Sequence, residues 1–274
     1  MNNDGFSYAD PADPLWKRIA IGALERATGA RRIERLYRTQ QALGWPDGFF
    51  RGAIEALSLD VIHDAARLSA APRHGPLVVV ANHPFGVLDG IVLCALLENV
   101  RPDFLVLTNA VLMRAPEMRA RVLPVDFENT PQARRTNVES RARALAHVEA
   151  GGCVVIYPAG AVSTSPDRWG RTSAVDGPWT PFAARLVAQS RASVLPVYFP
   201  GQNSRLFQIA SHIHPMLRLG LFFHEVRRRI GSRFPVVIGD TLPPERLATL
   251  DRAATLAALR AAVYGLGADQ PRPR

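Results

Sequence analysis

The stretch Leu-Val-Val-Val-Ala-Asn-His-Pro-Phe-Gly-Val-Leu-Asp-Gly, residues 77–90, carries the pattern that decides the fold. Residues 77–81 are apolar and mostly β-branched, which predicts a strand buried on both faces. A short polar turn follows, and a helix is expected over residues 90–98. A buried strand that turns directly into a helix is typical of layered α/β proteins, in which functional groups lie at the carboxyl ends of the strands.

Short apolar runs and helical patterns continue to alternate on the carboxyl-terminal side of this stretch. The runs are β-branched throughout, as expected of strands covered by helices on both sides. We therefore predict an α/β fold with a mostly parallel central sheet flanked by helices. The expected strands are residues 104–107, 122–125, 154–157, 194–199 and 236–239, and the expected helices are residues 137–150, 179–190, 217–230 and 252–264.

The segment before this domain has a different pattern. In residues 15–43, apolar residues recur at three- and four-residue spacing with basic residues between them, which predicts an N-terminal basic amphipathic helical segment. Such a helix can lie on an anionic membrane surface, or it can pack on the main domain with a solvated basic face. The expected organisation is a helical segment at 1–71, the α/β domain at 72–266 and a disordered polar tail at 267–274.

Composition limits the classes of function. The 274 residues carry a formal net charge of +9, and the basic residues are arginines apart from Lys17. This charge favours an acidic lipid surface, a nucleic acid or an acidic carrier protein, although a biased codon usage explains the arginines equally well. No nucleic-acid motif accompanies them, so no nucleic-acid partner is expected.

Localisation and metal binding are also limited by the sequence. The two cysteines, Cys94 and Cys153, stand in apolar runs and are expected to be buried and reduced. No Cys/His spacing predicts a metal site. Residues 1–14 lack a secretory pattern and no stretch is long enough to span a membrane, so we expect a cytoplasmic protein with at most peripheral membrane contact.

His83 and Asp89 are the candidate catalytic pair. A histidine at the end of a strand can take a proton with one ring nitrogen while a carboxylate holds the other. Alone, the pair is equally compatible with a turn histidine and an aspartate that caps a helix.

The surrounding residues add a family resemblance. Asn82-His83-Pro84-Phe85-Gly86 with Asp89 resembles the histidine–aspartate block of the glycerolipid and lysophospholipid acyltransferase superfamily, particularly its hemolysin-like and ornithine-lipid acyltransferase branch. Three further blocks follow in the family's order. They are residues 112–125 with Arg114, Arg119 and Arg121; residues 157–163, Tyr-Pro-Ala-Gly-Ala-Val-Ser; and residues 194–197, Val-Leu-Pro-Val, with 201–205 after them.

The resemblance implies an enzyme of membrane-lipid metabolism, in phospholipid biosynthesis, located at the inner face of the plasma membrane. It would move a fatty acyl group from an acyl carrier protein or coenzyme A thioester to a lipid hydroxyl or amine, with no cofactor or metal. His83 would be the general base and Asp89 its orienter, and backbone N–H groups near Gly86 or Gly160 would bind the oxyanion. Substrate contacts are expected from Asn82, Phe85, Gly86, Arg114, Arg119, Arg121, Tyr157, Pro158, Gly160, Ser163 and Asn203. The alternative is an inactive protein that binds a membrane or an acyl carrier.

Two departures from the family pattern bear on the acceptor. The aspartate stands six positions after the histidine, as in the named branch, whereas five is usual in the superfamily. In the third block, Ala159 and Val162 replace a glutamate and an arginine that the family associates with a phosphorylated glycerol acceptor. An amine- or hydroxyl-bearing lipid of the ornithine-lipid kind is therefore expected to be a better acceptor than glycerol 3-phosphate or lysophosphatidate.

Overall fold

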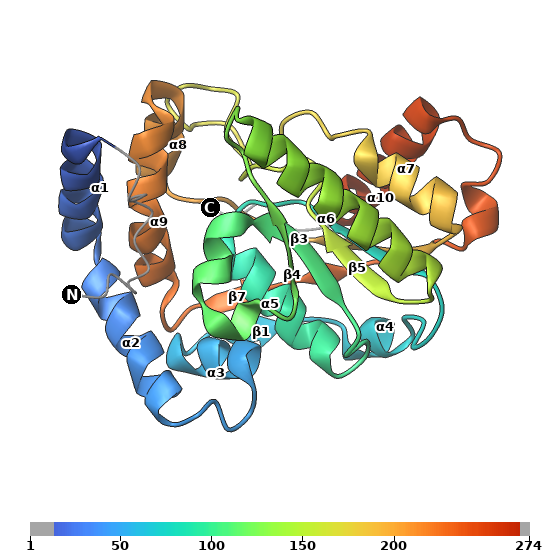
Figure 1. Cartoon of the computed structure of the whole chain (residues 1–274), viewed down its shortest axis with the longest axis horizontal. Helices are drawn as coiled ribbons and strands as arrows, with labels where there is room; N and C mark the ends of the chain where they lie inside the picture. The colour runs from blue at the N-terminus through green and yellow to red at the C-terminus, as the bar shows by residue number, and fades with distance from the viewer. Residues whose placement is uncertain (1–13, 269–274) are drawn as a thin grey trace.

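The computed structural model describes residues 14–268 and has a six-stranded sheet at its centre (Figure 1). The strand order is β4-β3-β5-β2-β6-β8, and every pairing is parallel except that of β6 with β8. The predicted mostly parallel sheet is therefore confirmed. The strands are β2 (Leu77–Ala81), β3 (Leu105–Asn109), β4 (Val122–Val125), β5 (Cys153–Ile156), β6 (Ser193–Tyr198) and β8 (Val237–Ile238).

Helices cover both faces of the sheet, which explains why its strands are apolar throughout. Alternate residues of a strand point to opposite faces. Leu77 and Val79 of β2 pack towards α5 (Val87–Glu98), whereas Val78 and Val80 belong to the core on the other face. That second face is covered by α6 (Pro131–Glu149), α7 (Phe182–Ser190) and α10 (Arg252–Ala268). Cys94 and Cys153 are buried free thiols, as expected.

A second group of helices stands beside this layered core. It consists of α1 (Leu15–Thr28), α2 (Ala30–Ala42), α3 (Phe49–Ala56), α8 (Arg205–Ile213) and α9 (Pro215–Arg229). Helix α1 lies along α9 (Figure 1), and the Thr28 hydroxyl donates a hydrogen bond to the carbonyl of Gly220 at 2.9 Å. The predicted basic helical segment therefore packs on the main domain, while its contact with a membrane stays a prediction.

The ends of the main domain differ from the sequence-based expectation in detail. Residues 1–71 include α4 (Ala65–Ser69) and a short strand β1 (Asp60–Ile62), which pairs in parallel with β7 (Arg233–Pro235). The last helix continues to Ala268, so residues 267 and 268 are helical, and the rest of the predicted tail lies outside the described residues. Residues 1–13, most of the stretch that lacks a secretory pattern, also lie outside the described residues. Within residues 14–268, no helix is long and apolar enough to cross a membrane.

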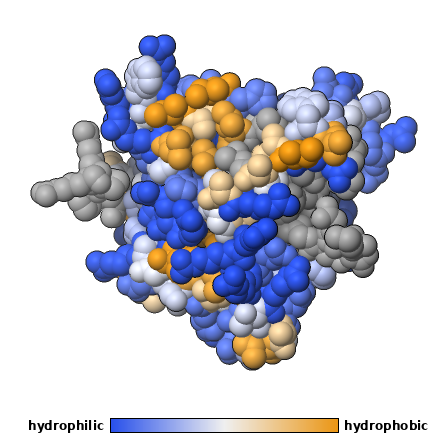
Figure 2. Space-filling model, turned by 90° about the vertical axis from the view of Figure 1, so that its left-hand side faces the viewer, coloured by the Kyte–Doolittle hydropathy of each residue, from blue (hydrophilic) through white to orange (hydrophobic). Residues whose placement is uncertain are grey.

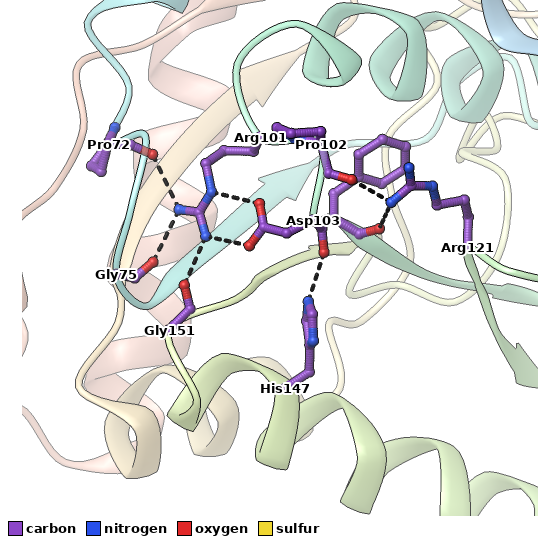
Figure 3. Close-up of polar contacts among 9 residues, drawn as sticks. Pro72, Gly75, Arg101, Pro102, Asp103, Arg121, His147 and Gly151 are labelled. Atoms are coloured by element: carbon purple, nitrogen blue, oxygen red, sulfur yellow. Dashed lines mark hydrogen bonds and ion pairs between the residues drawn. The ribbon is translucent and has the colours of Figure 1, made fainter. Parts of the chain in front are cut away.

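A fully buried arginine closes the amino-terminal edge of the sheet (Figure 3). The guanidinium of Arg101 donates to the carboxylate of Asp103 at 2.8 and 2.9 Å and to three carbonyls at 2.9–3.1 Å. The carbonyls belong to Pro72, Gly75 and Gly151. All five N–H groups of the side chain are thus used, and the loops that lead into β2, β3 and β5 are tied together.

Candidate active site

The three strands β5, β2 and β6 are neighbours, and the segments that follow them meet at the carboxyl-terminal edge of the sheet. Tyr157 follows β5, His83 follows β2 and the loop at 199–204 follows β6. Three of the four blocks identified in the sequence are therefore brought together by the strand order. This is the edge where open α/β sheets hold their ligands.

His83 and Asp89 face each other at this edge. Nδ1 of His83 lies 3.1 Å from Oδ2 of Asp89, an ion-pair contact that does not reach the geometry of a well-aligned hydrogen bond. The His83 side chain is 16% exposed and that of Asp89 is fully buried. The two side chains are within the reach that a base and its orienting carboxylate require. The six-residue spacing therefore does allow the two side chains to meet.

The turn between them depends on Gly86. This residue has φ 67° and ψ −120°, a backbone conformation available essentially to glycine alone. A β-carbon there would also lie 3.0 Å from Phe222 and 3.2 Å from Val162. With the turn closed in this way, the backbone N–H of Phe85 donates to Oδ2 of Asp89 at 2.8 Å. The N-cap of α5 is Gly86, so Asp89 is not the capping residue; it lies within the first turn, where it accepts from the N–H of Phe85 and faces His83.

The electrostatics of Asp89 reflect two opposed effects. Burial raises the pKa of Asp89 above its ordinary value of 3.8, while His83 and the backbone N–H groups of the turn favour the ionised carboxylate. The amino-terminal end of α5 also favours a negative charge. Its Oδ1 atom makes no hydrogen bond to the residues that the structure describes. The carboxylate is therefore held in place by the N–H of Phe85 and by its contact with His83.

Tyr157 supports the imidazole from the side of β5. The two rings are 4.2 Å apart at their centroids and inclined by 32°. Burial, followed by the nearby Asp89 and Cys94, raises the pKa of Tyr157 well above 10, so the phenol stays protonated. This tyrosine is buried, and its contact is with the candidate base itself.

Two residues expected to contact substrate, Asn82 and Ser163, form hydrogen bonds within the turns. The Asn82 amide donates to the Phe199 carbonyl at 2.9 Å and accepts from its N–H at 2.7 Å. The N–H of Ser163 donates to the carbonyl of His83 at 2.8 Å, and its hydroxyl to Asp176 at 2.5 Å. The polar atoms of these two side chains are therefore engaged in hydrogen bonds within the fold.

The remaining members of the predicted site differ in accessibility. Phe85, Pro158 and Asn203 are buried beside the turn, and Nδ2 of Asn203 makes no hydrogen bond to the described residues. Gly160 is half-buried against Phe127, but its N–H donates to the carbonyl of Tyr157 at 2.9 Å. That N–H is therefore already used by the turn and does not supply the oxyanion donor that the sequence led us to expect.

The second block does not reach the pair as expected. The strand register places Arg121 level with Val78, five residues short of His83, which is about 16 Å along the strand direction. Its guanidinium donates to the carbonyls of Pro102 and Phe104 near the Arg101 cluster, at the opposite edge of the sheet (Figure 3). The expectation that Arg121 binds substrate beside His83 is therefore corrected, because a parallel strand begins at the edge away from the site.

The two other arginines of this block have separate outcomes. Nε of Arg119 donates to the carbonyl of Met113 at 3.0 Å on η1 (Ala110–Arg114), and the side chain is exposed. The side chain of Arg114 lies outside the described part of the structure. The contacts of these two arginines with substrate stay predictions.

Asp176, in the loop between β5 and α7, belongs to the site although no sequence pattern indicated it. Its buried carboxylate accepts hydrogen bonds from the N–H of His83 at 3.2 Å and from the hydroxyl of Ser163 at 2.5 Å. No periodicity or motif marks this residue, because it stands 93 positions from His83 in an irregular loop. Within the described residues, no group of three or more His, Cys, Asp or Glu side chains could hold a metal ion.

Comparison with known proteins gives two findings. A sequence model for a family described as acyltransferase matches residues 46–230. The fold is similar to that of the 1-acyl-sn-glycerophosphate (LPA) acyltransferase PlsC from Thermotoga maritima, with a TM-score of 0.52, 14% identity, and coverage of 95% of this chain and 92% of that one. At this identity the likeness concerns the fold alone. No curated protein matches the sequence.

Proposed function

This chain belongs to the acyltransferase family, and we propose that it moves a fatty acyl group from an acyl thioester to the hydroxyl or amine of a membrane lipid. The predicted superfamily is confirmed by the family match, whereas its hemolysin-like and ornithine-lipid branch stays a prediction. The observation that carries the proposal is the contact between His83 and the buried Asp89 at the sheet edge. Coenzyme A and acyl carrier protein are both candidate donors.

The geometry fits direct transfer without a covalent enzyme intermediate. The neutral imidazole of His83 takes the proton of the acceptor as its oxygen or nitrogen attacks the thioester carbonyl. Asp89 keeps the ring oriented through Nδ1 and stabilises the imidazolium that forms. When the tetrahedral intermediate collapses, the C–S bond breaks and the thiolate takes the proton back from His83. The acid and base steps therefore use one residue, and no cofactor is required.

The environment of the third block supports a hydroxyl- or amine-bearing acceptor. Val162 is buried in an apolar cluster with Phe207, Leu221 and Phe222. A phosphate monoester is usually selected by arginine forks or by a helix N-terminus. An apolar side chain stands where the family places such an arginine, and Arg121 lies at the other edge of the sheet. The replacement by Val162 favours an acceptor of the ornithine-lipid kind, and Arg229, whose guanidinium stacks on the ring of Phe85 at 4.2 Å, is an arginine that does lie beside the turn.

A membrane surface is the proposed location of the reaction. Figure 2 shows apolar and strongly hydrophilic patches side by side on the face of the molecule formed by α1, α2, α8 and α9. Leu15, Trp16 and Ile19 on α1 are more than 60% exposed, as is Ile213 on α8. Exposed apolar side chains next to arginines suit the interface of an anionic bilayer. We place this face against the inner side of the plasma membrane, where the acceptor resides.

One assay tests the chemistry and the acceptor together. Purified protein receives one acyl thioester and an equimolar mixture of lyso-ornithine lipid, lysophosphatidate and glycerol 3-phosphate, and the products are identified by mass spectrometry. We expect the ornithine lipid to be acylated preferentially. His83→Ala should lower turnover by about 10²–10⁴-fold, whereas His74→Ala, an exposed histidine at the far edge, should not. Near-normal turnover by His83→Ala would refute the mechanism, and a preference for lysophosphatidate would refute the acceptor.

A further inference from the structure

The carboxylate of Asp176 is surrounded by hydrogen-bond donors. Oδ1 accepts from the N–H of His83 and the hydroxyl of Ser163, and Oδ2 accepts from Nε1 of Trp179 at 2.9 Å. The side chain is 3% exposed. One buried carboxylate thus joins the turn after β2, the loop after β5 and the approach to α7. No other side chain in the described structure is bonded to the His83 N–H.

The backbone of the same residue is held by the carboxyl-terminal helix α10. Asp176 donates its N–H to the Tyr264 hydroxyl at 2.7 Å and accepts at its carbonyl from Nη2 of Arg260 at 2.9 Å. Nη1 of Arg260 donates to the neighbouring Gly177 carbonyl at 2.9 Å. Helix α10 begins at Arg252, beyond the residues matched by the family model. An element outside the family region is therefore connected to His83 through a single residue.

We propose that Asp176 is a positioning residue for His83 and that α10 fixes the position of Asp176. The inference rests on the proposed role of His83 as general base. A catalytic base acts only when its nitrogen lies within hydrogen-bond reach of the proton that it removes, and a displacement of about 1 Å can lower the rate about 10²-fold. The hydrogen bond from the N–H of His83 to the carboxylate of Asp176 fixes the backbone of His83, and the position of this backbone sets where the ring lies.

A carboxylate is specifically suited to this position. Both of its oxygens face donors, and an ionised carboxylate has acceptors only. In Asp176→Asn, the amide NH₂ must face either Trp179 or the pair formed by His83 and Ser163, so one donor meets another donor. Removing the indole N–H in the double variant Asp176→Asn/Trp179→Phe lets the remaining oxygen turn towards His83. The double variant should therefore recover activity that the single variant has lost.

The experiment measures kcat and KM for the acyl thioester, together with the thermal unfolding midpoint. We expect Asp176→Asn to lower kcat by about 10- to 100-fold with KM changed less than about twofold, because the base is misplaced while binding is intact. The double variant should regain at least about threefold in kcat without regaining stability, since Phe leaves space around the Trp179 site. Tyr264→Phe should also lower kcat, because it removes the hydroxyl that accepts from the N–H of Asp176. Tyr198→Phe is the matched control, since its ring stands beside Tyr264 at a centroid distance of 5.9 Å.

The outcomes separate this inference from the function on which it rests. If His83→Ala is inactive but Asp176→Asn keeps normal kcat, or if the double variant gains stability but no activity, the positioning role is overturned and the general base remains. Equal effects of Tyr264→Phe and Tyr198→Phe on kcat would overturn the contribution of α10. Normal activity of His83→Ala would overturn the proposed mechanism itself.

Discussion

In the proposed mechanism, Asp89 has a function that conflicts with the stability of the fold. An orienting carboxylate has to be ionised to stabilise an imidazolium, yet burial disfavours that charge and raises the pKa of Asp89. The N–H of Phe85 and the amino-terminal end of α5 recover only part of this cost. The free energy of ionisation is therefore worse in the folded protein than in the unfolded chain.

This conflict predicts a variant with opposite effects on activity and stability. Asp89→Asn should lower turnover by about 10²-fold or more, because the neutral amide cannot stabilise the imidazolium. Wild-type stability should fall as the pH rises from about 3.8 to the raised pKa of the folded state, since the folded protein binds the proton more tightly there. Asn has no such dependence. The free energy of unfolding of the variant, relative to that of the wild type, should therefore increase across this pH window and then stay constant.

Urea unfolding of both proteins between pH 4 and pH 9, combined with the acyl-transfer assay, checks this prediction. Asp240→Asn serves as the control, because that side chain is 86% exposed. A variant that is less stable than the wild type at pH 8 would contradict the argument.

At the scale of elements, α1 has two faces with different tasks. Its Ile21 is buried and Thr28 is bonded to α9, so the helix belongs to the folded domain. Trp16 and Ile19 point outwards and are 66% and 62% exposed. Deleting α1 would uncover α9 as well as removing these side chains, so point substitutions test membrane contact more cleanly.

We expect Trp16→Ser/Ile19→Ser to weaken binding to vesicles of anionic lipid by about tenfold, because each substitution removes an apolar side chain from the interface. Cosedimentation at low and high salt measures the effect. Val138→Ser on α6 is the control, with a side chain equally exposed at 65% on a different part of the molecule. Unchanged binding by the double variant, or equal weakening by the control, would leave α1 with packing as its single role.

Some elements were predicted from the sequence with their bounds, whereas the short amphipathic helices α3 and α8 were missed. β4 has the predicted bounds, and α1 and α2 are separated at Gly29, where φ is 106°. β1 and β7 were missed because three-residue strands leave no detectable alternation. His83 and Asp89 were identified as a candidate pair because they are close in sequence, whereas the positions of Asp176 and Arg121 depend on strand order and direction. The strand order and direction that place Asp176 and Arg121 are known only from the folded structure.

For the molecule as a whole, the Arg101 cluster predicts a large effect of one buried side chain. Arg101→Met would leave the carbonyls of Pro72, Gly75 and Gly151 without their donor. We expect a loss of at least about 2 kcal/mol of unfolding free energy, because hydrogen bonds to a charged group contribute about 1.5–3 kcal/mol each. Chemical denaturation measures it, with the exposed Arg38→Met as the control.

The pH dependence of this difference follows from Asp103. Its hydrogen bonds with Arg101 hold the pKa of Asp103 below the ordinary value of 3.8. The corresponding stability is present above that value and is lost as the pH falls through the pKa of the folded state. The gap between wild type and Arg101→Met should therefore narrow in acid. A gap that is below 1 kcal/mol at neutral pH, or that widens in acid, would contradict the structural role of this cluster.

The position of β2 in the sheet has a consequence for synthesis. It lies between β5 and β6, so one of its hydrogen-bonding edges stays open until residue 193 and beyond has left the ribosome. β1 stays unpaired still longer, until its partner strand at Arg233–Pro235 has been synthesised. Contacts of such high sequence separation slow folding and leave apolar edges open to other chains. The nascent chain should therefore depend on chaperones until its last quarter emerges, and truncations before β7 should aggregate.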